Sequence, residues 1–187
     1  DPDAGRLRAA KKAIESTNLS EKVTFLNKSL KQLMLVEESI DVALVSHVIQ
    51  HIRSTDVHGF FKRVFRYLKV GGLFLIETSH STRANGYFVV NSIQNNKLIT
   101  KEIEEREFNS KALYKKETLP AHCFTFTELE EVLSSVGFSI VERGVSHELS
   151  KVPILNKIIN RDWLINVHPL VQDKFGSNLY LVCSKSI

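Results

Sequence analysis

The feature that most constrains the fold of this chain is the alternation of amphipathic helix patterns with short apolar stretches of strand length. Apolar residues recur at helical spacing over residues 3–17, 56–69 and 126–136, which predicts helices. The stretches that indicate strands are residues 23–26, 40–45, 73–76, 138–141 and 179–182. Helices alternating with strands predict an α/β fold with a mainly parallel sheet.

Local signals fix where two of these helices begin or end. Gly71 and Gly72 follow the helix pattern of residues 56–69, and we expect them to end it and form the turn into the next strand. Thr125 and Glu128 have the spacing of a capping box, so a helix is expected to begin at Thr125. Gly137 is expected to end that helix before the strand at 138–141.

Composition narrows the class of protein. The 187 residues suit one domain, and a net charge of +4 spread along the chain favours a solvated basic surface over a nucleic-acid interface. The two cysteines form no metal or redox motif, so we expect no metal and a reducing, cytoplasmic setting. No run reaches the roughly 18 apolar residues of a membrane span. The chain begins Asp-Pro-Asp rather than with Met, so we expect the native start to lie upstream.

Five segments, in this order and spacing, resemble the class I methyltransferases that use S-adenosylmethionine (SAM), in particular those acting on small molecules. They are Asp1 with the helix after it, and residues 23–30, 40–52, 61–77 and 124–138. The resemblance implies a single, partial domain over residues 1–187. It also implies a Rossmann-like, doubly wound, mainly parallel sheet whose last strand is antiparallel.

Such a sheet binds its ligand beyond the carboxyl ends of the strands. The resemblance places Asp1 at the ribose diol of SAM, with Asp3 as a substitute; both also suit an ordinary helix N-terminus. Many members have an acid at the position of Ser29 to accept from the adenine amino group. Here a hydroxyl would accept that bond, and the N–H of Leu30 would meet a ring nitrogen. The alternative for this pair is a plain turn.

Ser46 and His47 follow the strand at 40–45, where the resemblance places the methionine part of SAM and the substrate. His51 lies on the next turn, and His122 precedes the capped helix. Each histidine is a candidate general base for a hydroxyl or ammonium acceptor, because imidazole titrates near neutral pH. The alternative for each is a packed or surface residue.

Residues 79–122 interrupt the regular pattern, with helical spacing over 88–94 and 98–107. In the family this place holds a lid over the acceptor, and long connections are often functional. Side chains that suit a lid pocket are Tyr87, Phe88, Phe108, Tyr114, Arg83, Arg106 and Lys111. A surface excursion is the alternative. The apolar cluster at 152–165, with Trp163, suits a second wall, core packing, a membrane-surface patch or a homodimer contact.

The glycine-rich loop of the family's cofactor site is absent, and we expect it upstream of Asp1 together with the first two strands. We therefore expect these 187 residues alone to bind SAM poorly and to be inactive. The function that the resemblance implies is methyl transfer from SAM to an oxygen, nitrogen or carbon atom of a small molecule. Alternatives are a non-catalytic relative that serves as a binding or scaffold protein, and an oxidoreductase that uses a nicotinamide cofactor.

Overall fold

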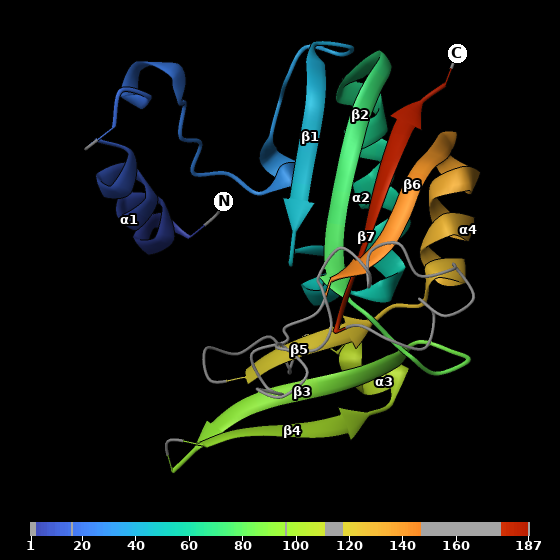
Figure 1. The fold of residues 1–187 in the computed structure, drawn as a ribbon. Helices are drawn as coiled ribbons and strands as arrows, with labels where there is room; N and C mark the ends of the chain where they lie inside the picture. Colours follow the sequence, from blue (N-terminus) through green and yellow to red (C-terminus); the bar gives the residue numbers. More distant parts are fainter. Residues whose placement is uncertain (1–2, 16, 96, 111–117, 147–176, 187) are drawn as a thin grey trace, which may run out of the picture. The chain divides into compact units, whose positions relative to one another are not determined.

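A computed structural model describes residues 3–15, 17–95, 97–110, 118–146 and 177–186 of the chain (Figure 1). Contacts divide the chain into two compact units, Asp1–Val36 and Glu37–Ile187, and each is described by itself. The cluster at 152–165 with Trp163 lies outside the described residues, as do Asp1, Lys111 and Tyr114. In the part that is described, no helix has the length and hydropathy needed to cross a membrane.

The first unit contains the helix α1 (Ala4–Glu15) and two short 3-10 helices, η1 (Ser20–Lys22) and η2 (Leu30–Gln32). The carboxylate of Asp3 accepts hydrogen bonds from the N–H groups of Gly5 (2.7 Å) and Arg6 (3.0 Å), which helps to start α1. The prediction of a strand at residues 23–26 is wrong, because this segment has no regular structure. A strand needs a neighbour to share its hydrogen bonds, and the described part of this unit contains no second strand.

The second unit is built on a mixed sheet whose four strands have the order β1-β2-β7-β6. The strands are β1 (Ile40–Ser46), β2 (Leu68–Ser79), β6 (Phe138–Ser146) and β7 (Asn178–Lys185). β1 and β2 are parallel, whereas β7 is antiparallel to both β2 and β6. The expectation of an antiparallel last strand is confirmed.

Two helices, α2 (Ser54–Tyr67) and α4 (Phe126–Val136), supply the apolar core of this unit. Phe61 of α2 packs edge-to-face on Phe74 of β2, with the ring centroids 5.8 Å apart. Phe65 packs in the same way on Phe138 of β6, at 5.0 Å. The buried residues of the two helices are Val57, Phe61, Val64, Tyr67, Phe126, Leu129 and Leu133. Helical spacing in the sequence thus corresponds to one buried face on each helix.

The role expected for Gly71 and Gly72 is wrong. α2 ends at Tyr67, and the chain continues directly into β2, which contains both glycines. The register of β1 against β2 shifts here, from Ile40↔Leu68 to Val42↔Leu73. Gly71 has a φ of 77°, and a Cβ on Gly72 would lie 2.9 Å from the carbonyl oxygen of Lys69. The glycines therefore allow a bulge and a close backbone approach inside the strand.

Residues 79–122 contain a second sheet of three antiparallel strands, β3 (Tyr87–Gln94), β4 (Lys97–Ile103) and β5 (Thr118–Cys123), in the order β4-β3-β5. The helical interpretation of residues 88–94 and 98–107 is wrong except at the short helix α3 (Glu105–Phe108). β-branched residues are frequent in both segments and favour strands. Asn95, with a φ of 50°, begins the tight turn that pairs β3 with β4.

The start and end predicted for α4 are confirmed. The hydroxyl of Thr125 accepts from the N–H of Glu128 at 3.2 Å, and the carboxylate of Glu128 accepts from the N–H of Thr125 at 2.8 Å. Gly137 ends the helix in the left-handed conformation, with a φ of 111°. The chain then enters β6.

Candidate functional site

The predicted site residues lie in both units. Ser46 is the last residue of β1, His47 follows it, and His51 ends the 3-10 helix η3 (Ile49–His51). Ser29 and Leu30 belong to the first unit. Their convergence with Ser46 and His47 on one crevice therefore stays a prediction.

Ser29 caps the short helix η2, and Leu30 is its first residue. The hydroxyl of Ser29 donates to Oε1 of Gln32 at 2.9 Å, and the same oxygen accepts from the backbone N–H of Ser29 at 3.0 Å. A donating hydroxyl keeps lone pairs that can accept a further bond. The N–H at the first position of a helix has no partner within the helix. Both groups therefore suit contacts with a polar ring.

In the second unit, the carboxyl ends of the parallel strands β1 and β2 bring a serine, a histidine and a glutamate together. The hydroxyl of Ser46 donates to Oε2 of Glu77 at 2.9 Å, and the N–H of His47 donates to the carbonyl oxygen of Glu77 at 2.9 Å. Nε2 of His47 lies 4.0 Å from Oε1 of Glu77, and these side chains are 43% and 35% exposed. A ligand beyond this sheet edge can therefore reach a carboxylate and an imidazole.

The backbone of His47 has a φ of 52°, which is unusual for a residue other than glycine. A residue held in this region costs about 1–3 kcal/mol and persists only where neighbouring contacts fix it. For His47 the fixing contacts are the N–H bond to Glu77 and a 3.3 Å contact between Nδ1 and Oε1 of Gln50. Such strain is typical of residues whose position matters for function.

The side chain of Gln50 is 8% exposed and joins the turn after β1 to the end of β2. Its Oε1 accepts from the N–H of Ser79 at 2.9 Å and from the hydroxyls of Ser79 and Thr78 at 3.0 and 3.2 Å. The sequence interpretation missed Gln50 and Glu77. The rule that functional residues follow strands would have found Glu77, whereas Gln50 has no signal beyond its place near two histidines.

His51 has both ring nitrogens engaged. Nδ1 lies 2.7 Å from the carbonyl oxygen of Pro120 in β5, and Nε2 lies 3.3 Å from Nε2 of Gln50. The ring therefore joins the turn after β1 to the three-stranded sheet. In this conformation neither nitrogen is available to take a proton from a substrate.

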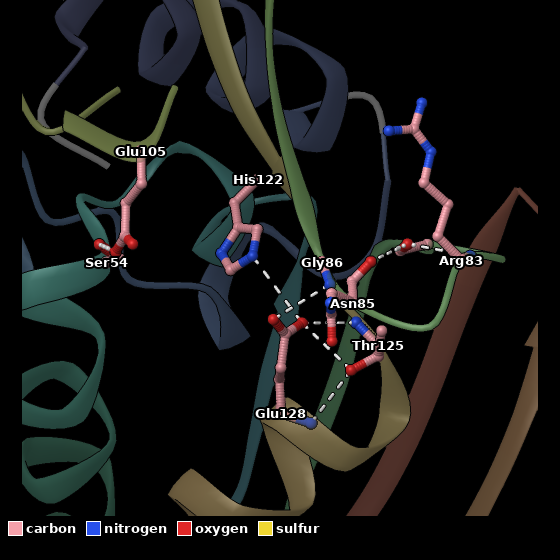
Figure 2. A network of polar contacts seen from close by, with 9 residues as sticks. Ser54, Arg83, Asn85, Gly86, Glu105, His122, Thr125 and Glu128 are labelled. Atoms are coloured by element: carbon pink, nitrogen blue, oxygen red, sulfur yellow. Dashed lines mark hydrogen bonds and ion pairs between the residues drawn. The ribbon is translucent and has the colours of Figure 1, made fainter. Parts of the chain in front are cut away.

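His122 of β5 is 6% exposed, and neither ring nitrogen has a hydrogen-bond partner. The ring lies between those of Phe88 and Phe124, at centroid distances of 4.3 and 3.8 Å. Figure 2 shows it pointing toward the carboxylate of Glu128, with Nε2 at 3.9 Å from Oε2. Burial lowers the pKa of His122 from 6.5 to about 4, and the charge of Glu128 offsets only part of that effect. The ring is therefore neutral and enclosed at neutral pH.

A cavity of about 260 Å³ lies at the start of α4. Its lining residues are His80, Ser81, Thr82, Arg83, Ala84, Thr125, Phe126 and Thr127. Of the residues expected in a lid pocket, Arg83 lines it, and its guanidinium is bound by Glu102 at 2.7 and 2.9 Å. None of the predicted catalytic histidines contributes to this cavity.

Comparison with known proteins gives a family match and a set of similar folds. Residues 1–76 match the model of a methyltransferase domain. No curated protein matches the chain.

One similar structure is 1,6-didemethyltoxoflavin-N1-methyltransferase of Burkholderia thailandensis, with bound 1,6-didemethyltoxoflavin and S-adenosylhomocysteine. It has 16% identity over 94% of this chain and a TM-score of 0.57, and the chain spans only 56% of its length. The match to the CcbJ methyltransferase of Streptomyces caelestis covers 100% of this chain and 78% of CcbJ, with 11% identity and a TM-score of 0.65. The match to the [4+2]-cyclase SpnF covers 99% of this chain and 65% of SpnF, with 12% identity and a TM-score of 0.60.

Residues 1–76 are thus similar to a methyltransferase domain, and the chain shares its fold with solved SAM-dependent methyltransferases.

Proposed function

We propose that the protein transfers a methyl group from SAM to a small-molecule acceptor. The observation that carries this proposal is the family match over residues 1–76, which includes β1 and most of β2. The carboxyl ends of these two parallel strands carry Ser46, His47 and Glu77. Ligands of doubly wound sheets bind at such ends, which is why we place the reaction there.

In this proposal the chain's own residues hold the cofactor at both of its ends. Asp1 would hold the ribose diol, Ser29 and Leu30 the adenine ring, and Ser46 and His47 the methionine part. The cap at Ser29 and the half-exposed groups after β1 offer hydrogen-bonding atoms of the required kinds. When bound, SAM supplies an electrophilic methyl group, and the protein contributes proximity and orientation.

Among the three histidines, we assign the general base to His47. Its ring is partly exposed at the sheet edge, and Nε2 faces the carboxylate of Glu77. An acceptor group that lies beyond this sheet edge can therefore reach Nε2 with the proton that it must lose. His51 and His122 have structural roles in this proposal, because one is engaged at both nitrogens and the other is enclosed by aromatic rings.

We also infer that the three-stranded sheet forms one wall of the acceptor site. It is joined to the region after β1 by the contact of His51 with Pro120. The helix α3, which follows β4, is bound to the start of α2 by Ser54, whose N–H donates to Oδ1 of Asn109 at 3.0 Å and whose hydroxyl donates to Glu105 at 2.6 Å. The acceptor is then a molecule small enough to lie between this sheet and the carboxyl ends of β1 and β2.

The test uses the complete protein, since this chain spans only 56% of one similar methyltransferase. Titration calorimetry with S-adenosylhomocysteine should give saturable heat, and candidate small molecules should then be screened for SAM consumption. Absence of heat at high concentration would favour a scaffold protein. Binding with conversion of a substrate but no methyl transfer would favour another reaction on this fold, as in the cyclase SpnF.

A further inference from the structure

The buried amide of Gln50 lies within hydrogen-bonding distance of one nitrogen on each of two histidine rings. Oε1 is 3.3 Å from Nδ1 of His47, and Nε2 is 3.3 Å from Nε2 of His51. A neutral imidazole carries its proton on one nitrogen only, and its partners decide which one. The orientation of a single amide can therefore control the proton positions of both rings.

The backbone of Ser79 settles which way this amide points. Its N–H is an obligatory donor and lies 2.9 Å from Oε1, so the amide oxygen must be on that side. The hydroxyls of Thr78 and Ser79 are further donors to the same oxygen, and they can rotate to other acceptors if it is saturated. The NH2 group of Gln50 consequently faces His51.

His51 must then accept at Nε2, because the facing group of Gln50 is a donor. Its proton is on Nδ1, which donates to the carbonyl oxygen of Pro120 at 2.7 Å. The two contacts of the ring agree on one neutral tautomer, since a carbonyl can only accept. His51 is thus fixed in position and protonation at the junction with β5.

The same orientation decides the tautomer of His47. Because Oε1 is an acceptor, Nδ1 of His47 carries the proton and donates across 3.3 Å. The competing arrangement, with the proton on Nε2, would direct it at Glu77 across 4.0 Å, which is beyond hydrogen-bonding distance. Nε2 of His47 is left with a lone pair at the exposed sheet edge.

We propose that Gln50 is a positioning residue that selects Nε2 of His47 as the basic atom and holds His51 in the complementary tautomer. The use of that atom in methyl transfer rests on the proposed function, whereas the tautomers do not. The amide acts through the two rings and touches neither substrate nor cofactor. Substitution of Gln50 should therefore change proton positions even with no ligand present.

The experiment measures ring nitrogen chemical shifts by NMR in the complete protein labelled with ¹⁵N-histidine, at neutral pH. His47 and His51 are assigned with the single variants H47Q and H51Q. In the parent, both rings should show a protonated Nδ1 and an unprotonated Nε2. In Q50M, which keeps the length but removes the amide, the His47 signals should lose this pattern. S79A, which removes one hydroxyl and keeps the N–H, should leave both rings unchanged.

Q50E is a second test that does not depend on Q50M being well folded. Its carboxylate still accepts from Nδ1 of His47, so that nitrogen should stay protonated. It cannot donate to His51, so Nε2 of His51 must take a proton and both nitrogens of that ring should become protonated. An Nε2-protonated His47 in the parent, or rings unchanged in both Gln50 variants, would overturn the proposal. Methyl transfer, measured separately, tests the proposed function and not these proton positions.

Discussion

Replacing His122 by phenylalanine should remove a pH-dependent loss of stability from this protein. His122 is neutral and buried between Phe88 and Phe124, with no hydrogen-bond partner for either ring nitrogen. In the unfolded chain the ring has its ordinary pKa of 6.5, whereas burial lowers the pKa to about 4 in the folded protein. The unfolded state therefore binds a proton more readily than the folded state.

The direction in which pH changes the folding stability follows from this difference in pKa. Above pH 6.5 both states are neutral at His122, and the contribution to stability is fully present. As the pH falls from 6.5 toward about 4, the unfolded state becomes protonated first, and folding stability declines. At about 1.4 kcal/mol per pH unit, the full loss is about 3 kcal/mol. The negative charges of Glu128 and Glu105 favour the protonated ring and keep the loss from being larger.

The assay is urea unfolding of the parent and H122F at a series of pH values from 7 down to about 4, the folded pKa of the ring. Other groups titrate in both proteins, so the quantity of interest is the difference in unfolding free energy between them. H122F should gain about 3 kcal/mol relative to the parent across this range. H58Q, which changes an exposed histidine of α2, is the matched control and should follow the parent. Parallel curves for H122F and the parent would show that burial does not lower the pKa of His122 in the folded protein.

Three further substitutions test other parts of the structure. G86A should destabilise by about 1–3 kcal/mol in urea unfolding, because its Cβ would lie 2.7 Å from Nε2 of His122 and against the carboxylate of Glu128; an unchanged midpoint would contradict this. T125A removes the cap of α4 and should cost about 1 kcal/mol in the same assay, with T127A as a control outside the capping box. H47Q should lower methyl transfer about 10²–10⁴-fold even when SAM is saturating, so that weaker binding of the methionine part does not account for the loss. Retained turnover in H47Q would remove that residue as the base.

The sequence predicted those elements whose signals are local. α2 and α4 each have an apolar face at helical spacing, and the capping residues of α4, Thr125 and Glu128, lie within one helical turn. The segments of β3 and β4 also fit a helical pattern, because apolar residues in a short segment can match either period. Its β-branched residues and the turn at Asn95 were the available evidence for a hairpin.

The site was predictable only in part, for a physical reason. Ser46 and His47 could be found because they directly follow an apolar strand. The contacts that give His47 its geometry come from Gln50 and from Glu77, which is contributed by the neighbouring strand β2. Such contacts depend on strand register and on the bulge at Gly71, and no local pattern encodes either. Residues 23–26 have the composition of a strand but form none, because a strand also needs a neighbour to share its hydrogen bonds.

A structure of the complete protein with S-adenosylhomocysteine would show directly whether the strand ends form one cofactor site. We expect the adenine ring within hydrogen-bonding distance of Ser29 or the N–H of Leu30, and the methionine end beside Ser46 and His47. A ligand bound elsewhere, or these positions lying on separate surfaces, would contradict the assignment of the strand ends to one cofactor site.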